Sequence, residues 1–234
     1  MYNKRSIRCH QRNEYFNKET DMIGFYNYTV ILTYASLLIS TLGIGLAAAD
    51  HPYPALFCLL ASGICDMFDG KVARTRRKST DEERRFGIQI DSLCDLVCFG
   101  VLPAVIGMRI SAAPLGIALG VLYVLCAMIR LAYFNVTEET RQATETGRRT
   151  HFLGVPVTTA AVVFPLVFAL SVLMTEIGGG LALLAPWLYP ALLLITAVAF
   201  ISPVRVRKPH GVGLAVMGAI GLGECALMLY LLIK

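Results

Sequence analysis

Charged residues are scarce in this sequence. They make up 16% of the 234 residues, whereas about a quarter is usual in soluble domains, and 56% of the residues are hydrophobic. The mean hydropathy is +0.63. Such a composition indicates a membrane protein and excludes an ordinary soluble domain. Basic loops facing anionic lipid headgroups account for the net charge of +5, and no nucleic-acid-binding signature is present, so we expect no nucleic-acid partner.

Features of exported proteins are also missing. The first 23 residues carry five basic side chains and no apolar run of signal-peptide length, so we expect this end to be neither cleaved nor exported. The seven cysteines are odd in number, include no CxxC pair and lie mostly in apolar segments. We therefore expect neither a disulfide framework nor a structural zinc site, and interpret the cysteines as small buried hydrophobes.

What the sequence does contain is a series of long apolar segments. A hydrocarbon core about 30 Å thick requires roughly 20 apolar residues per crossing helix, and such stretches recur from Asn27 onward. This pattern predicts an all-α, polytopic membrane protein with about six to seven transmembrane helices. Residues 1–26 would form a cytosolic juxtamembrane segment and residues 27–234 a single transmembrane domain. The expected helices are 27–49, 53–74, 86–107, 112–136, 154–176, 185–202 and 211–233.

Lysine and arginine concentrate in alternate connections between these helices. They gather in the N-terminal tail, in Arg74–Arg85, in Arg141–Arg149 and in Arg205–Lys208, whereas the opposite connections contain only Arg109. Cytosolic loops are enriched in these residues. We therefore expect the N-terminus and the basic connections on the cytosolic side of a prokaryotic cytoplasmic membrane, with Gly178–Gly180 as an external turn.

Four aspartates interrupt two of the apolar segments, on either side of one basic loop. Asp66 and Asp69 are three residues apart near the end of the second predicted helix, and Asp91 and Asp95 are four residues apart near the start of the third. Each pair therefore shares one helical face. An acid within a membrane segment costs about 2.5 kcal/mol or more and indicates a functional site. If the two helices pack antiparallel, the four carboxylates converge at the cytosolic boundary.

Divalent cations are the partners that such a cluster requires. Four negative charges in a small volume repel one another strongly unless they are neutralised. Ligation by carboxylates alone favours Mg²⁺ or Mn²⁺, which complete their shells with water and substrate phosphates, and two such ions about 4 Å apart suit an in-line displacement at phosphorus. We expect two divalent cations and a phosphorylated substrate. The predicted ligands are Asp66, Asp69, Asp91 and Asp95.

Small and basic residues follow the first aspartate pair. Gly70 and Ala73 lack bulk, so a nucleotide could approach the helix backbone closely, and Arg74 could then contact a diphosphate. An alternative interpretation of the two small residues is that they allow close packing between membrane helices. The sequence does not separate these interpretations.

Together these residues resemble a known family signature. The order Asp66-x2-Asp69-Gly70-x2-Ala73-Arg74-x12-Gly87-x3-Asp91-x3-Asp95 is similar to that of the CDP-alcohol phosphatidyltransferase family. The gap before Gly87 is longer than usual in the family and contains the charged run Asp81–Arg85. An insertion in a cytosolic loop would leave the site intact.

Further segments resemble the members of the family whose acceptor alcohol is L-serine. Phosphatidylglycerophosphate-forming members resemble the chain less, because they typically carry Pro and Lys where this chain has Ser92 and Leu96. Tyr133 and Thr158 depart from the commoner Arg and Pro of the serine-using members. The similar segments are FGIQIDSLCDLVCFGVLPA from Phe86, RLAYFNV from Arg130 and FLGVPVTTAA from Phe152.

The resemblance implies a fold, an activity and residue roles. It implies the all-helical fold of that family, CDP-diacylglycerol and L-serine as the substrates, and a homodimer. Asp91 and Asp95 would be the catalytic pair, with Asp95 accepting the proton of the attacking hydroxyl. The residues implied to hold the CDP group are Asp66, Gly70, Ala73 and Arg74.

Selection of serine would require a cation for its carboxylate. Arg130 is the preferred candidate among Arg130, Arg148, Arg149, Arg205 and Arg207, although an arginine extending to the lipid headgroups is an alternative. Asn135 could donate to the same substrate or act as a helix cap.

Three other functions stay open at this point. The acceptor could be glycerol phosphate or inositol phosphate, which would need an additional basic pocket. A transporter would also explain buried acids in many helices, but transporter sites usually lie near the bilayer midplane between repeated halves, and no repeat is evident. A non-catalytic scaffold would leave the four aspartates unexplained.

Overall fold

The structure is a computed structural model that describes residues 24–26, 28–73, 80–144 and 151–207, and residues 221, 223, 224, 226, 227, 229 and 230. Residues 1–23 of the predicted juxtamembrane segment and most of the predicted helix 211–233 lie outside this description. The elements are η1 (Tyr28–Val30), α2 (Ile31–Ala48), α3 (Pro52–Ala73), α4 (Asp81–Asp95), η2 (Leu96–Val101), α5 (Leu102–Ile110), α6 (Leu115–Thr144), β1 (His151–Leu153), η3 (Val157–Thr159), α7 (Ala160–Ile177), α8 (Gly179–Ile201) and β2 (Arg205–Arg207).

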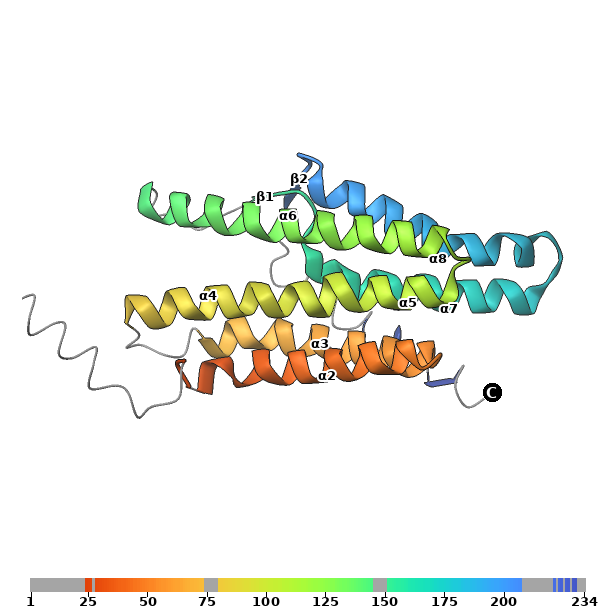
Figure 1. The fold of residues 1–234 in the computed structure, drawn as a ribbon, viewed down its shortest axis with the longest axis horizontal. Coiled ribbons are helices and arrows are strands. Elements are labelled where there is room, and N and C mark those ends of the chain that lie inside the picture. Colours follow the sequence, from red (N-terminus) through yellow and green to blue (C-terminus); the bar gives the residue numbers. More distant parts are fainter. Residues whose placement is uncertain are drawn as a thin grey trace, which may run out of the picture.

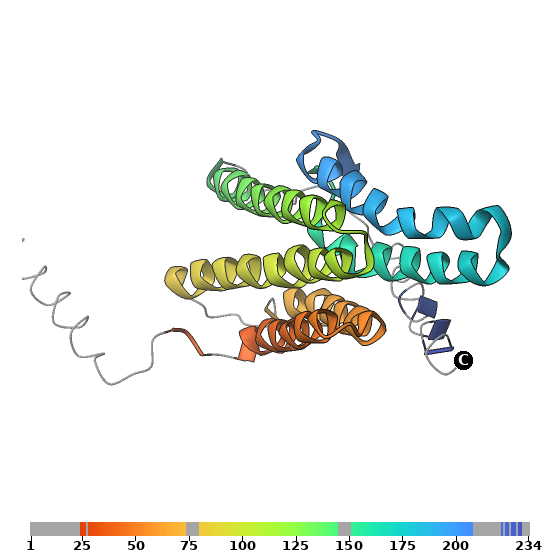
Figure 2. The ribbon, with the colours of Figure 1, turned by 45° about the vertical axis from the view of Figure 1, so that its right-hand side comes forward.

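The helices form a bundle around one long central rod. In this rod α4, the π-helix η2 and α5 follow one another without a break (Figure 1). Helices α2 and α3 pack together on one side of the rod, and α6 and α8 lie on the other (Figure 2). Helix α7 packs against both α8 and α3. The rod therefore contacts both halves of the bundle.

Five of the described helical segments are long and apolar enough to cross a membrane. They are 31–48, 81–110, 115–141, 157–177 and 179–201. Helix α3 packs between these segments but is not one of the five, because its two aspartates reduce its mean hydropathy. Large apolar side chains such as Leu38 and Leu183 are more than two-thirds exposed, as expected for a surface that faces lipid. The all-helical membrane fold predicted from the sequence is confirmed, with one short strand pair in addition.

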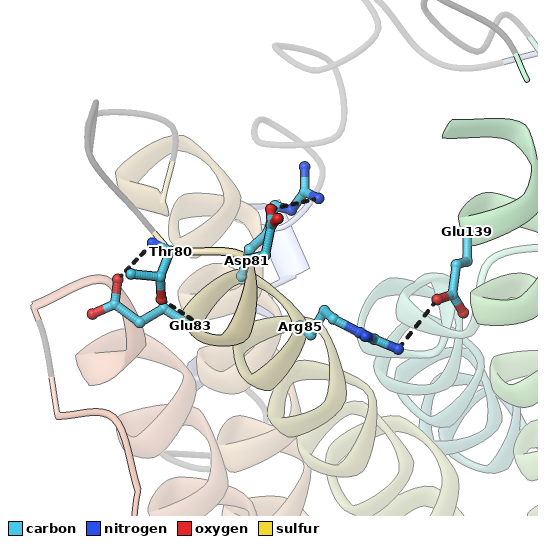
Figure 3. A network of polar contacts seen from close by, with 6 residues as sticks. Thr80, Asp81, Glu83, Arg85 and Glu139 are labelled. Carbon is cyan, nitrogen blue, oxygen red and sulfur yellow. Dashed lines mark hydrogen bonds and ion pairs between the residues drawn. The ribbon is translucent and has the colours of Figure 1, made fainter. Parts of the chain in front are cut away.

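The two ends of the bundle carry different polar contacts. At one end Arg85 of α4 pairs with Glu139 of α6 at 3.5 Å, as Figure 3 shows. At the other end Arg109 donates from Nε to Asp50 at 2.8 Å, and this bond lowers the pKa of the Asp50 carboxyl below its ordinary value. Strands β1 and β2 pair antiparallel, which joins the two segments that the sequence placed on the cytosolic side.

Two predicted helix boundaries are wrong because polar and charged residues extend the helices. Helix α4 begins at Asp81 instead of residue 86, because Thr80 and Glu83 form a capping box (Figure 3). Helix α6 continues to Thr144 instead of residue 136 and carries the Glu138–Arg141 pair at 2.6 Å on one face. Both helices therefore extend further at the same end of the bundle (Figure 1).

The predicted turn at Gly178–Gly180 is also shorter than expected. Only Gly178 separates α7 from α8, and both Gly178 and Gly179 have the positive φ angles that glycine adopts without strain. The predicted helix began at residue 185, next to Pro186. The structure instead contains Pro186 and Pro190 within α8, as membrane helices tolerate.

Replacing Gly63 by alanine tests the packing of α3 on α7. The new Cβ would overlap with the Cβ of Ala161, so we expect a loss of about 1–3 kcal/mol of stability, as is usual for overpacking. Gly45→Ala is the matched control, because no described atom lies within 4 Å of that position. Thermal unfolding in detergent should give a lower midpoint for Gly63→Ala alone. Equal midpoints would show that the two helices do not pack this closely.

Candidate metal centre

Three of the four aspartates converge between α3 and α4. One carboxylate oxygen from each of Asp66, Asp91 and Asp95 lies within 4.8 Å of the other two. All three side chains are partly buried. The i, i+4 spacing of Asp91 and Asp95 directs both carboxylates from α4 toward α3, where they meet Asp66. The structure therefore brings together residues that are up to 29 positions apart in the sequence.

Asp69 lies at the edge of this group. Its carboxyl interacts with that of Asp91 and accepts a long hydrogen bond of 3.5 Å from the hydroxyl of Thr33 on α2. The side chain is 9% exposed. Asp69 thus stands beside the three converging acids, with one oxygen oriented by α2.

The cluster requires a positive partner. Among the described residues, no lysine, arginine or histidine forms an ion pair with any of the four aspartates. Like charges this close in a partly buried site repel strongly. The available donors are all carboxylate oxygens, which fit Mg²⁺ or Mn²⁺ and not a soft metal. The site can therefore hold a divalent cation.

A chain of buried hydroxyl and thiol groups lies next to the carboxylates. Cys94 donates from its thiol to the Thr33 carbonyl at 3.2 Å and lies 3.5 Å from the Cys98 sulfur. Ser36 of α2 contacts Cys98 at 3.4 Å and donates to the Ser62 carbonyl of α3 at 3.2 Å. These contacts tie α2, α3 and the rod together. The five described cysteines are free thiols, and three of them are buried, namely Cys94, Cys98 and Cys126.

Sequence reasoning missed Thr33, Ser36 and Ser62. A signal was present, because Thr33, Ser36 and Ser40 recur at helical spacing in an apolar segment and would share one face. Hydroxyl groups in membrane helices commonly bond across a helix interface. All three of these α2 side chains are buried.

No described residue fills the space beside Gly70 or beside Gly87. A Cβ at either glycine would meet no described atom within 4 Å, so these two glycines do not serve close helix packing here. The packing alternative does hold for other glycines, such as Gly63 and Gly43. Ala73 ends α3, but its side chain and all of Arg74 lie outside the described residues.

The two predicted acceptor residues are on α6. Arg130 is 6% exposed, stacks on Phe134 with 5.4 Å between its guanidinium carbon and the ring centroid, and packs against Gly154. The alternative in which Arg130 extends to the headgroups is therefore wrong. No described contact joins Arg130 to the aspartates. Arg148 and Arg149 lie outside the described residues, as do the side chains of Arg205 and Arg207.

Asn135 is directed at the carboxylate-bearing helix. Its amide donates to Ser92 Oγ at 2.8 Å, and Ser92 donates to Asn135 Oδ1 at 3.2 Å. Because α6 continues to Thr144, Asn135 does not cap that helix, and the capping alternative is wrong. Asn135 of α6 thus contacts Ser92, the residue that follows Asp91 in α4.

The chain is similar to known membrane-lipid enzymes over much of its length. A family model described as CDP-alcohol phosphatidyltransferase matches residues 26–201. A CDP-diacylglycerol–serine O-phosphatidyltransferase of Helicobacter pylori is 33% identical over 140 residues, which cover 58% of this chain and 55% of the relative. Enzymes of the same name from Mycobacterium leprae and Saccharomyces cerevisiae are 33% and 32% identical, over 77% and 66% of this chain and 58% and 52% of theirs. The chain thus spans little more than half the length of these relatives.

Replacing Asp66 by asparagine tests the repulsion within the cluster. In the presence of a chelator we expect Asp66→Asn to raise the unfolding midpoint by about 2–4 °C, because one repelling charge is removed. Mn²⁺ should stabilise the wild-type protein more than this variant. Asp50→Asn, at the opposite end of the bundle, is the control and should respond to Mn²⁺ like the wild type. An equal response of Asp66→Asn would contradict the metal site.

Proposed function

The chain belongs to the CDP-alcohol phosphatidyltransferase family, and from this membership we propose that it transfers the phosphatidyl group of CDP-diacylglycerol to the hydroxyl of L-serine. The products would be phosphatidylserine and CMP. The convergence of three carboxylates within 4.8 Å is the observation that supports the chemistry. The names of the relatives support serine as the acceptor, and a further relative, 30% identical, is named archaetidylserine synthase.

The aspartates would hold two divalent cations, Mg²⁺ or Mn²⁺, and move one proton. When bound, the cations supply charge neutralisation to the diphosphate of the donor. The ligands would be Asp66, Asp69, Asp91 and Asp95, with Thr33 fixing the orientation of Asp69. Asp95 would accept the proton of the serine hydroxyl while the serine oxygen forms the new bond to the phosphatidyl phosphorus. The bond from that phosphorus to the CMP oxygen breaks, and CMP leaves with the electron pair.

The CDP group would lie on the open side of α3 and α4. A Cβ at Gly70 or at Gly87 would meet no described atom within 4 Å. Backbone that a ligand approaches closely favours glycine. By family resemblance Ala73 and Arg74 complete the contacts to the nucleotide, together with Asp66.

Arg130 would bind the carboxylate of serine, and Asn135 would help to orient it. Arg130 is buried, so it places a positive charge inside the protein. There its attraction for an anionic substrate group is stronger than at a solvent-exposed surface. Asn135 contacts Ser92, next to Asp91, and so lies close to the reacting region. Phosphorylated acceptors would need a further basic pocket, and no described contact supplies one.

The setting that we propose is the cytoplasmic membrane of a prokaryote, with the aspartates on the cytosolic side. The positive-inside pattern of the connections supports this orientation. CDP-diacylglycerol would then reach the site laterally from the bilayer, while serine would arrive from the cytosol. Family resemblance also favours a homodimer.

A panel of acceptor alcohols tests the proposed reaction. Purified protein is incubated with CDP-diacylglycerol and L-serine, glycerol phosphate or inositol phosphate, each with Mg²⁺, Mn²⁺ or a chelator. We expect CMP release with serine and metal only, and a loss of at least about 100-fold in Asp95→Asn if this residue is the general base. CMP release with inositol phosphate but not with serine would contradict the assignment.

Removing the guanidinium of Arg130 tests the serine contact. We expect Arg130→Gln to raise the KM for serine at least about tenfold, because a buried charged contact contributes about 2 kcal/mol or more, and to leave the KM for CDP-diacylglycerol unchanged. Arg109→Gln, at the opposite end, is the control and should match the wild type. A folded Arg130→Gln protein with an unchanged serine KM would refute this role.

A further inference from the structure

The helix that carries Asp91 and Asp95 contains a π-helical segment directly after Asp95. The N–H of Leu102 donates to the carbonyl of Val97, five residues earlier, so η2 holds one residue more per turn than an α-helix would. One extra residue corresponds to a rotation of about 100° between the helical segments on either side. The direction of the aspartates relative to α5 therefore depends on this segment.

Proline at position 103 leaves one carbonyl of the segment without its α-helical donor. In an α-helix the carbonyl of Phe99 would accept from the N–H of residue 103, but Pro103 has none. Tyr123 of α6 supplies a replacement, because its hydroxyl donates to the Phe99 carbonyl at 2.7 Å. Both Phe99 and Tyr123 are fully buried, so water does not take the place of this donor.

The Tyr123 ring is fixed by its surroundings. It packs against Phe164 of α7 and Phe200 of α8, each with 5.4 Å between ring centroids. One turn further along α6, Ala127 lies against Gly100, where a Cβ would come within 3.4 Å of it. Helix α6 thus meets the π-helical segment at two successive turns.

The far side of the segment is anchored independently. A Cβ at Gly107 of α5 would come within 3.0 Å of Tyr189 and would also meet Leu193, so α5 packs tightly on α8. With α5 held in place, the π-helical segment sets the rotation of α4, and with it the direction of both aspartates. Relaxation of this segment toward an α-helix would turn the two carboxylates away from Asp66.

We propose that Tyr123 is a positioning residue for the metal centre, acting through the Phe99 carbonyl. It replaces the N–H that Pro103 lacks, and so stabilises the π-helical segment that orients Asp91 and Asp95 toward Asp66. The inference rests on the proposed metal-dependent function but makes no assumption about the acceptor alcohol. Tyr123 itself touches none of the aspartates in the described contacts.

Three variants of the full chain test this role through Mn²⁺ affinity, measured by the electron paramagnetic resonance signal of unbound Mn²⁺. We expect Tyr123→Phe to bind Mn²⁺ about tenfold more weakly, the effect of a buried carbonyl that loses its donor. Combining it with Pro103→Ala restores an N–H at position 103. This N–H can donate to the Phe99 carbonyl while the π-type bond from Leu102 to Val97 is kept, so the affinity should return to within about threefold of wild type.

Tyr189→Phe is the matched control. Its hydroxyl donates to the Pro103 carbonyl at 3.1 Å, but that carbonyl faces the N–H of Gly107 within the regular helix α5, so this loss should change the affinity less than about twofold. Wild-type Mn²⁺ affinity in Tyr123→Phe, or no recovery in the double variant, would overturn the proposal. If Tyr123→Phe does not fold, recovery of both folding and Mn²⁺ binding in the double variant supports the proposal, and failure overturns it.

Turnover is measured separately on the wild type. A wild-type protein that binds Mn²⁺ but releases no CMP with serine would contradict the proposed function while leaving the Tyr123 comparison valid. If the wild type is active with serine and Tyr123→Phe binds Mn²⁺ with wild-type affinity, the positioning role alone is contradicted. The two failures are therefore distinguishable.

Discussion

Repulsion among the carboxylates of α3 and α4 is the constraint on which the rest of the structure depends. Asp66, Asp91 and Asp95 place oxygens within 4.8 Å of one another, and Asp69 stands beside them, with no basic partner among the described residues. In surroundings of low polarity such an arrangement is unstable without a cation. The helices α3 and α4 must therefore be held together by other contacts before metal binds.

The remainder of the bundle supplies those contacts. Helix α2 reaches both aspartate-bearing helices through Thr33 and Ser36, and the buried sulfur of Cys98 completes this link to the rod. On the other side α6 contacts the rod through Tyr123 and Asn135. Most of these bonds end on backbone carbonyls or on small hydroxyl groups. Inside a membrane such groups have no water to bond to, so they depend on partners within the protein. The same contacts that keep the helices together thus also orient the acids.

The sequence was sufficient to predict the helical membrane fold and the meeting of the acids, because both follow from short-range patterns. Hydropathy identifies the spans, and spacings of three and four residues fix which acids share a face. The extension of α6 beyond residue 136 was not predictable from hydropathy, since residues 137–144 are almost all polar or charged. For the same reason a helix cap at Asn135 stayed open as an alternative until the structure excluded it.

The π-helical segment and the bond from Tyr123 to Phe99 were also beyond prediction. Pro103 indicates that one helical hydrogen bond is missing, but the sequence does not show which side chain replaces it. That depends on how α6 packs across the rod, which is a contact between residues 24 positions apart. Likewise, the open space beside Gly70 became evident only once its neighbours were placed.

The most direct test of the central claim is an anomalous diffraction map of crystals grown with Mn²⁺. The account predicts manganese peaks enclosed by the carboxylates of Asp66, Asp69, Asp91 and Asp95, and their loss in crystals of Asp91→Asn. Manganese bound elsewhere, with these four side chains making no contact to it, would contradict the account.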